Sequence, residues 1–130
     1  QSYLLPSIPS GANTIQVSVP GHAPETINLT MPVPVALTST IPSTVASGTQ
    51  LTITWERDPA VELYDLYILN DANEWLDHVL TTDTTLVTQP LVGSGGARVY
   101  LQGLAPLAVG NNGSFITPVN TARVSFTLTP

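Results

Sequence analysis

The acidic side chains of this chain gather in one stretch, where they provide the ligand types of a metal site. Eight of its nine aspartates and glutamates lie between Glu56 and Asp83. Four oxygen-bearing side chains flank a predicted loop tip within that stretch: Asp71, Asn73, Glu74 and Asp77. Calcium prefers oxygen ligands of this kind, so the four form a candidate calcium site. The alternative is a solvated acidic edge hairpin, whose charges discourage aggregation between sheets.

Other arrangements for catalysis or metal binding are incomplete in the sequence. Glu56 and Asp58 share strand parity, as a glycosidase pair would, but a small β domain offers little cleft for a sugar. His22 and His78 are far apart and the chain has no cysteine, so a zinc site lacks ligands. We therefore expect a protein that is not an enzyme and that uses no cofactor.

Aromatic side chains provide a different chemistry, because their rings can stack on sugars. The rings that could do so are Trp55, Tyr64, Tyr67, Trp75 and Tyr100. Strand parity points Trp55 and Tyr64 inward, as core residues. Trp75 lies near the predicted loop, between Glu74 and Asp77, and is the candidate for an exposed, sugar-stacking aromatic. A packing role in the core or at a sheet edge remains the alternative for Trp75.

The charge of the chain restricts its partners. It has three arginines, no lysine and a net charge of -6. Nucleic-acid binding needs several cations on one face, so we expect no nucleic-acid partner. The longest apolar run, residues 31–37, contains two prolines and is far shorter than the ~20 residues of a membrane span, so we also expect no membrane insertion.

Several features favour an extracellular location, secreted or at the cell surface. The chain begins at Gln1 without a methionine, as a processed protein would. Asn28 and Asn112 each begin an Asn-x-Ser/Thr sequon and are candidate glycosylation sites. With 18 threonines and 10 serines, the surface is expected to be hydrated and low in charge.

Short strands are the elements that would position these residues. Period-two alternation of apolar residues predicts strands along most of the chain, separated by Gly, Pro and Asn turns. The clearest runs are 14–19, 26–31, 50–55, 64–69, 97–101 and 123–129. A helix over 60–80 is the alternative there, since Val61, Tyr64 and Ile68 also fit a helical spacing. The pattern predicts an all-β protein, an antiparallel Ig-like β-sandwich with an N-terminal strand-bearing extension.

Three segments carry a resemblance to known domains: Leu51-Thr52-Ile53-Thr54-Trp55, Asp58-Pro59 and Tyr64-Asp65-Leu66-Tyr67. With these, residues 37–130 resemble fibronectin type III and related immunoglobulin-like domains, until the pattern departs from the family after Pro106. The resemblance implies recognition or scaffolding rather than catalysis.

Residues 1–36 form a proline-rich arm that carries two strand-like runs. Ile15, Val17 and Val19 alternate in the first run, and Ile27 and Leu29 in the second. This pattern suits strand donation to a neighbouring subunit's sheet. The alternative is that the arm folds back onto its own domain.

The leading functional hypothesis is a non-enzymatic subunit of an extracellular surface filament or pilus-like fibre. Head-to-tail strand addition by the arm would assemble such a homopolymer. One alternative is a carbohydrate- or cell-wall-binding accessory module with glycan partners. A second alternative is a viral or phage surface or capsid protein.

Overall fold

The computed structural model describes residues 8–18, 20–110 and 115–130, and all regular secondary structure in these ranges is β. The predicted all-β class is therefore confirmed. The helical alternative for residues 60–80 is wrong, because that stretch forms strands β5 (Leu63–Asn70) and β6 (Trp75–Thr81).

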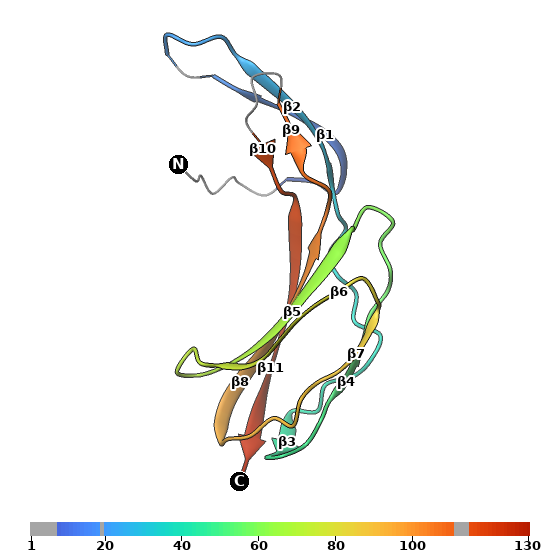
Figure 1. Cartoon of the computed structure of the whole chain (residues 1–130), viewed down its shortest axis with the longest axis vertical. Helices are drawn as coiled ribbons and strands as arrows, with labels where there is room; N and C mark the ends of the chain where they lie inside the picture. Colours follow the sequence, from blue (N-terminus) through green and yellow to red (C-terminus); the bar gives the residue numbers. More distant parts are fainter. Residues whose placement is uncertain (1–7, 19, 111–114) are drawn as a thin grey trace.

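Five strands form the largest sheet, in the order β3-β11-β8-β5-β6 (Figure 1). Its long central members are β8 (Gly95–Leu104) and β11 (Val119–Thr129). These two strands pair antiparallel, as do β8 with β5 and β5 with β6. The short edge strand β3 (Thr44–Ala46) runs parallel to β11.

A second, smaller layer covers one face of this sheet. It consists of β4 (Thr52–Thr54) and β7 (Thr85–Val87), paired antiparallel. Apolar side chains from both layers form one buried cluster, in which the predicted core residues Trp55 and Tyr64 meet edge to face with ring centroids 5.4 Å apart. We call β3 to β8 together with β11 the body.

The remaining strands form a smaller unit at the end of the molecule opposite the C-terminus, which we call the hairpin lobe (Figure 1). Here β1 (Gly11–Val17) pairs antiparallel with β2 (Glu25–Met31), and β9 (Ala108–Val109) pairs with β10 (Phe115–Ile116). The two strand-like runs of the arm thus pair with each other.

The lobe has its own small apolar cluster. Ile27 and Leu29 of β2 are buried against Ala108 of β9, with Ile15 and Met31 packed around them. The turn before β2 contains Gly21 at φ +82°, a conformation that glycine adopts without strain. No helix long and apolar enough to span a membrane occurs in the residues that the structure describes.

Candidate functional site

The loop between β5 and β6 determines where Trp75 lies. The Asn70 side-chain oxygen accepts hydrogen bonds from the backbone N–H groups of Ala72 and Glu74, each at 2.9 Å. Asn73 adopts φ 61°, a left-handed conformation that asparagine tolerates better than most residues. The register of the strand pair then shifts, which places Trp75 opposite Leu69. The indole is left 60% exposed.

Trp75 lies beside a row of side chains that crosses four strands. In strand register, Arg123 of β11 is opposite Tyr100 of β8, Tyr100 is opposite Tyr67 of β5, and Tyr67 is opposite His78 of β6. Their neighbours along β8 and β5 point into the core, so the row lies on the face turned away from β4 and β7. With strands about 4.8 Å apart, the row is about 14 Å long.

The aromatic rings of this face contact one another. Tyr67 and Tyr100 stack with centroids 4.8 Å apart and an interplanar angle of 14°. The Trp75 ring lies 5.2 Å from Tyr67 and 5.0 Å from His78. Because the two tyrosines are half-buried against each other, the open ring surface belongs mainly to Trp75.

Charged groups lie along the same row. His78 Nε2 is 2.7 Å from the Asp65 carboxylate. The guanidinium groups of Arg98 and Arg123 lie 6.0 Å and 5.7 Å from the centre of the Tyr100 ring, within reach of a cation–π interaction. The aromatic platform, as we call this surface, consists of Tyr67, Trp75, His78, Arg98, Tyr100 and Arg123.

The phenol of Tyr67 remains protonated over a wide pH range. Burial, followed by the nearby Tyr100 and Asp65, raises the pKa of Tyr67 above its ordinary value of 10.0. Tyr67 therefore provides the platform with a neutral hydroxyl at physiological pH, able to donate or accept a hydrogen bond.

The four candidate calcium ligands have separate partners. Asn73 Oδ1 accepts a hydrogen bond from Arg98 at 2.8 Å, and Glu74 Oε2 accepts one from the Asn70 amide at 2.8 Å. Asp77 is buried and accepts from the backbone N–H groups of His78 and Gln89. Asp71 is exposed beside Gly96. Among the described residues, no three His, Cys, Asp or Glu side chains gather closely enough to hold a metal ion.

The candidate strand-donation residues differ in exposure. Ile27 and Leu29 are buried in the lobe cluster, and Ile15 packs against it. Val17 is 41% exposed at the end of β1. Val19 lies outside the described residues.

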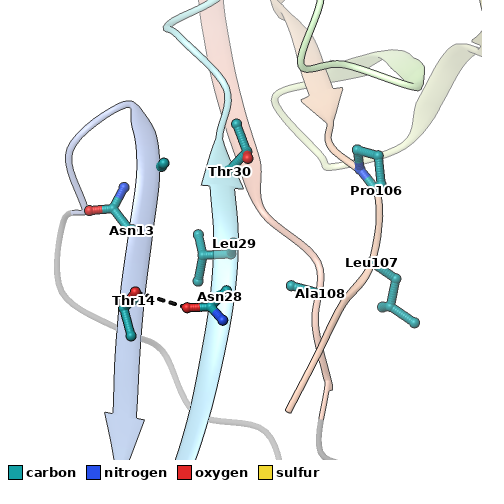
Figure 2. Close-up of a pocket in the computed structure, with 9 residues that line it drawn as sticks. Asn13, Thr14, Asn28, Leu29, Thr30, Pro106, Leu107 and Ala108 are labelled. Carbon is teal, nitrogen blue, oxygen red and sulfur yellow. Dashed lines mark hydrogen bonds between the residues drawn. The ribbon is translucent and has the colours of Figure 1, made fainter. Parts of the chain in front are cut away.

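The two candidate glycosylation sites lie in different parts of the chain. Asn112 is outside the described residues. Asn28 is exposed on β2, where its side-chain oxygen accepts a hydrogen bond from Thr14 at 2.9 Å. Figure 2 shows the Thr14 and Asn28 side chains beside an open groove of about 520 Å³, which the β1–β2 hairpin forms with residues 106–108. A glycan on Asn28 would project beside this groove.

Sequence reasoning named Tyr67, Trp75 and Tyr100 among the rings able to stack on sugars, but it missed His78, Arg98 and Arg123 as members of the platform. Arg98 shares strand parity with Tyr100, and that signal was readable from the sequence. Comparisons of the chain with protein-family models, characterised proteins and solved structures find no match. The function is therefore inferred from the site alone.

Proposed function

We propose that this protein is a non-enzymatic carbohydrate-binding module, the second of the hypotheses raised by the sequence. The observation that carries this proposal is the 60% exposure of Trp75 on an open sheet face, next to Tyr67 and His78. A contiguous exposed apolar surface, here the Trp75 ring continued by Tyr67 and His78, marks interaction sites on folded proteins. Indole and phenol rings combine an apolar face with a polar group, and this combination suits a sugar ring.

The rigidity of the platform supports the same function. Its rings pack against each other, and its two central strands, β5 and β8, pair on both sides in the five-stranded sheet, while β6 with Trp75 forms the edge. Side chains held in place before binding lose little conformational entropy when the ligand arrives. A surface row about 14 Å long suits an extended sugar chain better than a single small molecule.

Polysaccharide binding by a Trp75→Ala variant tests the proposal. Mobility in gels that contain soluble polysaccharides, together with pull-down on insoluble ones, measures affinity. We expect the wild-type protein to bind at least one polysaccharide and Trp75→Ala to bind it about tenfold more weakly, equivalent to about 1.4 kcal/mol of lost ring contact.

Val87→Ala is the matched control. Val87 is 57% exposed on β7, in the other layer, so its truncation also removes exposed apolar surface but leaves the platform intact. Equal binding by the wild type and Trp75→Ala would contradict the proposal. The proposal would also be contradicted if the wild-type protein bound none of the soluble or insoluble polysaccharides.

We also propose that the body has an immunoglobulin-like architecture, which its strand order supports. A five-stranded sheet β3-β11-β8-β5-β6 faces a two-stranded sheet β4-β7, with Trp55 in the core between them. Immunoglobulin-like domains pack two antiparallel sheets in this way and present binding surfaces outside a conserved type of core. An extracellular location, expected from the sequence, would suit such a module.

The edge of β1 favours a second candidate function, self-association into an extracellular fibre. Within the described residues, β2 is the only strand that pairs with β1. The other edge of β1 therefore resembles the open edges that accept or donate strands between subunits. Since Ile27 and Leu29 are buried in their own lobe, such an assembly would use β1 rather than β2.

Light scattering after size-exclusion chromatography tests this second function. We expect the wild type to form concentration-dependent oligomers and a Gln16→Lys variant, with a charge on β1, to remain monomeric. Thr40→Lys adds the same charge in an exposed loop and is the control. A wild-type protein that is monomeric at every concentration would exclude the fibre function.

A further inference from the structure

Positive charge gathers at the aromatic platform of an otherwise acidic protein. The chain has three arginines and no lysine, against nine acidic residues. Arg98 and Arg123 both lie on the platform, Arg98 two residues before Tyr100 on β8 and Arg123 opposite Tyr100 on β11. Arg57, the third arginine, lies between β4 and β5 and donates a hydrogen bond to the Thr82 carbonyl. Two of the three arginines of a chain with a net charge of -6 thus lie on one surface, where the acidic Asp65 pairs with His78.

The two platform arginines differ in how they are held. Arg98 is fixed, because its Nη2 donates to the Asn70 carbonyl at 3.0 Å and to Asn73 Oδ1 at 2.8 Å. Arg123 is exposed, and its guanidinium has no hydrogen-bond or ion-pair partner among the described residues. Asp65, an acidic residue of β5 on the same face, is paired with His78. All the N–H donors of Arg123 therefore remain available to a ligand.

We propose that the ligand of the platform is an acidic polysaccharide, with Arg123 recognising its carboxylate or sulfate groups. This inference rests on the proposed carbohydrate-binding function and adds the ligand's chemical class. A planar guanidinium binds a carboxylate or sulfate through two parallel hydrogen bonds, which a neutral sugar cannot match. Arg123 and Trp75 lie at opposite ends of the platform, so one sugar residue stacks on Trp75 while the anionic group of another reaches Arg123.

Charge complementarity favours an acidic polysaccharide over single-stranded nucleic acid, which also combines stacking with anionic groups. A nucleic acid carries a phosphate at every nucleotide and needs a basic groove along its path. This protein offers two arginines at one surface of a chain whose overall net charge is -6. An acidic polysaccharide can place its charges further apart and still use Arg123.

A matched pair of polymers tests the inference. The first polymer is a polyuronate, and the second is the same polymer with its carboxylates chemically reduced to primary alcohols. A sulfated polysaccharide and a single-stranded oligonucleotide form two further arms. Affinity is measured for each at low salt and at about 1 M salt, where the Debye length falls to about 3 Å and exposed charges are screened.

We expect the full chain to bind the polyuronate or the sulfated polymer more tightly than the reduced polymer, and to lose this preference at high salt. Arg123→Gln should weaken binding to the acidic polymer about threefold to tenfold, the range of a charge-assisted contact at a partly exposed site, and leave the reduced polymer unaffected. The arm with the higher affinity distinguishes carboxylate from sulfate. Arg57→Gln makes the same change in net charge away from the platform and should leave both affinities within about twofold.

The outcomes separate this inference from the function on which it rests. Equal binding of the acidic and reduced polymers, with both lost in Trp75→Ala, would overturn the acidic ligand and keep the carbohydrate-binding function. Equal losses in Arg57→Gln and Arg123→Gln would also overturn it, because net charge alone would then explain the preference. Tighter binding of the oligonucleotide would point to nucleic acid instead. No binding in any polysaccharide arm would overturn both proposals.

Discussion

The body and the hairpin lobe are stabilised by apolar clusters of very different size. Fourteen buried residues from both layers form the cluster of the body, whereas three, Ile27, Leu29 and Ala108, form that of the lobe. A unit of two separate strand pairs with so small an apolar cluster has little stability of its own and depends on what it packs against. The difference in cluster size indicates that the body is the more rigid part of the molecule. The aromatic platform lies on the body.

The largest expected effect comes from a cavity in the body. Leu101 on β8 is 1% exposed within the main cluster, so Leu101→Ala should reduce the free energy of unfolding by about 3 kcal/mol. Chemical denaturation measures this loss. Thr121→Ala, at an exposed position on β11, is the control and should change stability by less than about 0.5 kcal/mol. A loss below about 1 kcal/mol in Leu101→Ala would contradict the idea of a single continuous core.

A smaller loss is expected where a buried carboxylate joins β6 to the chain after β7. Asp77 accepts hydrogen bonds from the N–H groups of His78 and Gln89 at 2.8 Å and 2.9 Å. Asp77→Ala leaves these donors without that partner and should destabilise the body by about 2 kcal/mol. Asp83→Ala removes an exposed carboxylate and serves as the control in the same denaturation experiment. Equal stability of the two variants would show that the buried carboxylate contributes nothing.

In the lobe, a cavity should act locally. Ile27 is 2% exposed, but its cluster is small, so Ile27→Ala should destabilise the lobe without a matching loss in the body. Hydrogen exchange followed residue by residue measures this directly. We expect about tenfold faster exchange in β1 and β2 and unchanged exchange at the centre of β8 and β11, for a local loss of about 1.4 kcal/mol. Faster exchange in all four strands would show that lobe and body unfold together.

The smallest effect is on the stability of the body at alkaline pH, through Tyr67 on β5. Because the pKa of Tyr67 is raised in the folded protein, its contribution to stability is complete below the unfolded pKa near 10.0 and is lost as pH rises through the folded pKa. Tyr67→Phe removes this titration, so stability should decline less steeply above pH 10.0. Thermal melting at a series of alkaline pH values measures the slope. Identical slopes in wild type and variant would contradict the prediction.

The strands of this protein were largely predictable because they follow local alternation. Tyr64, Leu66 and Ile68 alternate with half-buried residues along β5, and Phe126 and Leu128 alternate with exposed residues along β11. The ambiguity over 60–80 arose because Tyr64 and Ile68 also fit a helical spacing. The Asn70 side chain resolves it, since its hydrogen bonds close a tight hairpin loop between two strands.

The platform was less predictable because it depends on register between distant strands. Parity places Arg98 and Tyr100 on one face, and this can be read from the sequence. Tyr67 and Arg123 lie opposite Tyr100, on the strands to either side of it. This placement follows only from the order and alignment of the three strands. Many alignments of short alternating strands satisfy the same pattern, and the packing of the core selects among them.

The alternation of β8 also protects the binding surface against misfolding. If β8 slipped by one residue against its neighbours, Tyr100 would turn inward while Val99 and Leu101 would turn out to water. Burial of those two apolar side chains thus disfavours a one-residue slip, which would separate Tyr100 from Arg123 and Tyr67. A mutation at Arg123, Tyr100, Tyr67 or His78 does not change the burial of Val99 and Leu101. Selection can therefore change what the surface recognises without destabilising the fold.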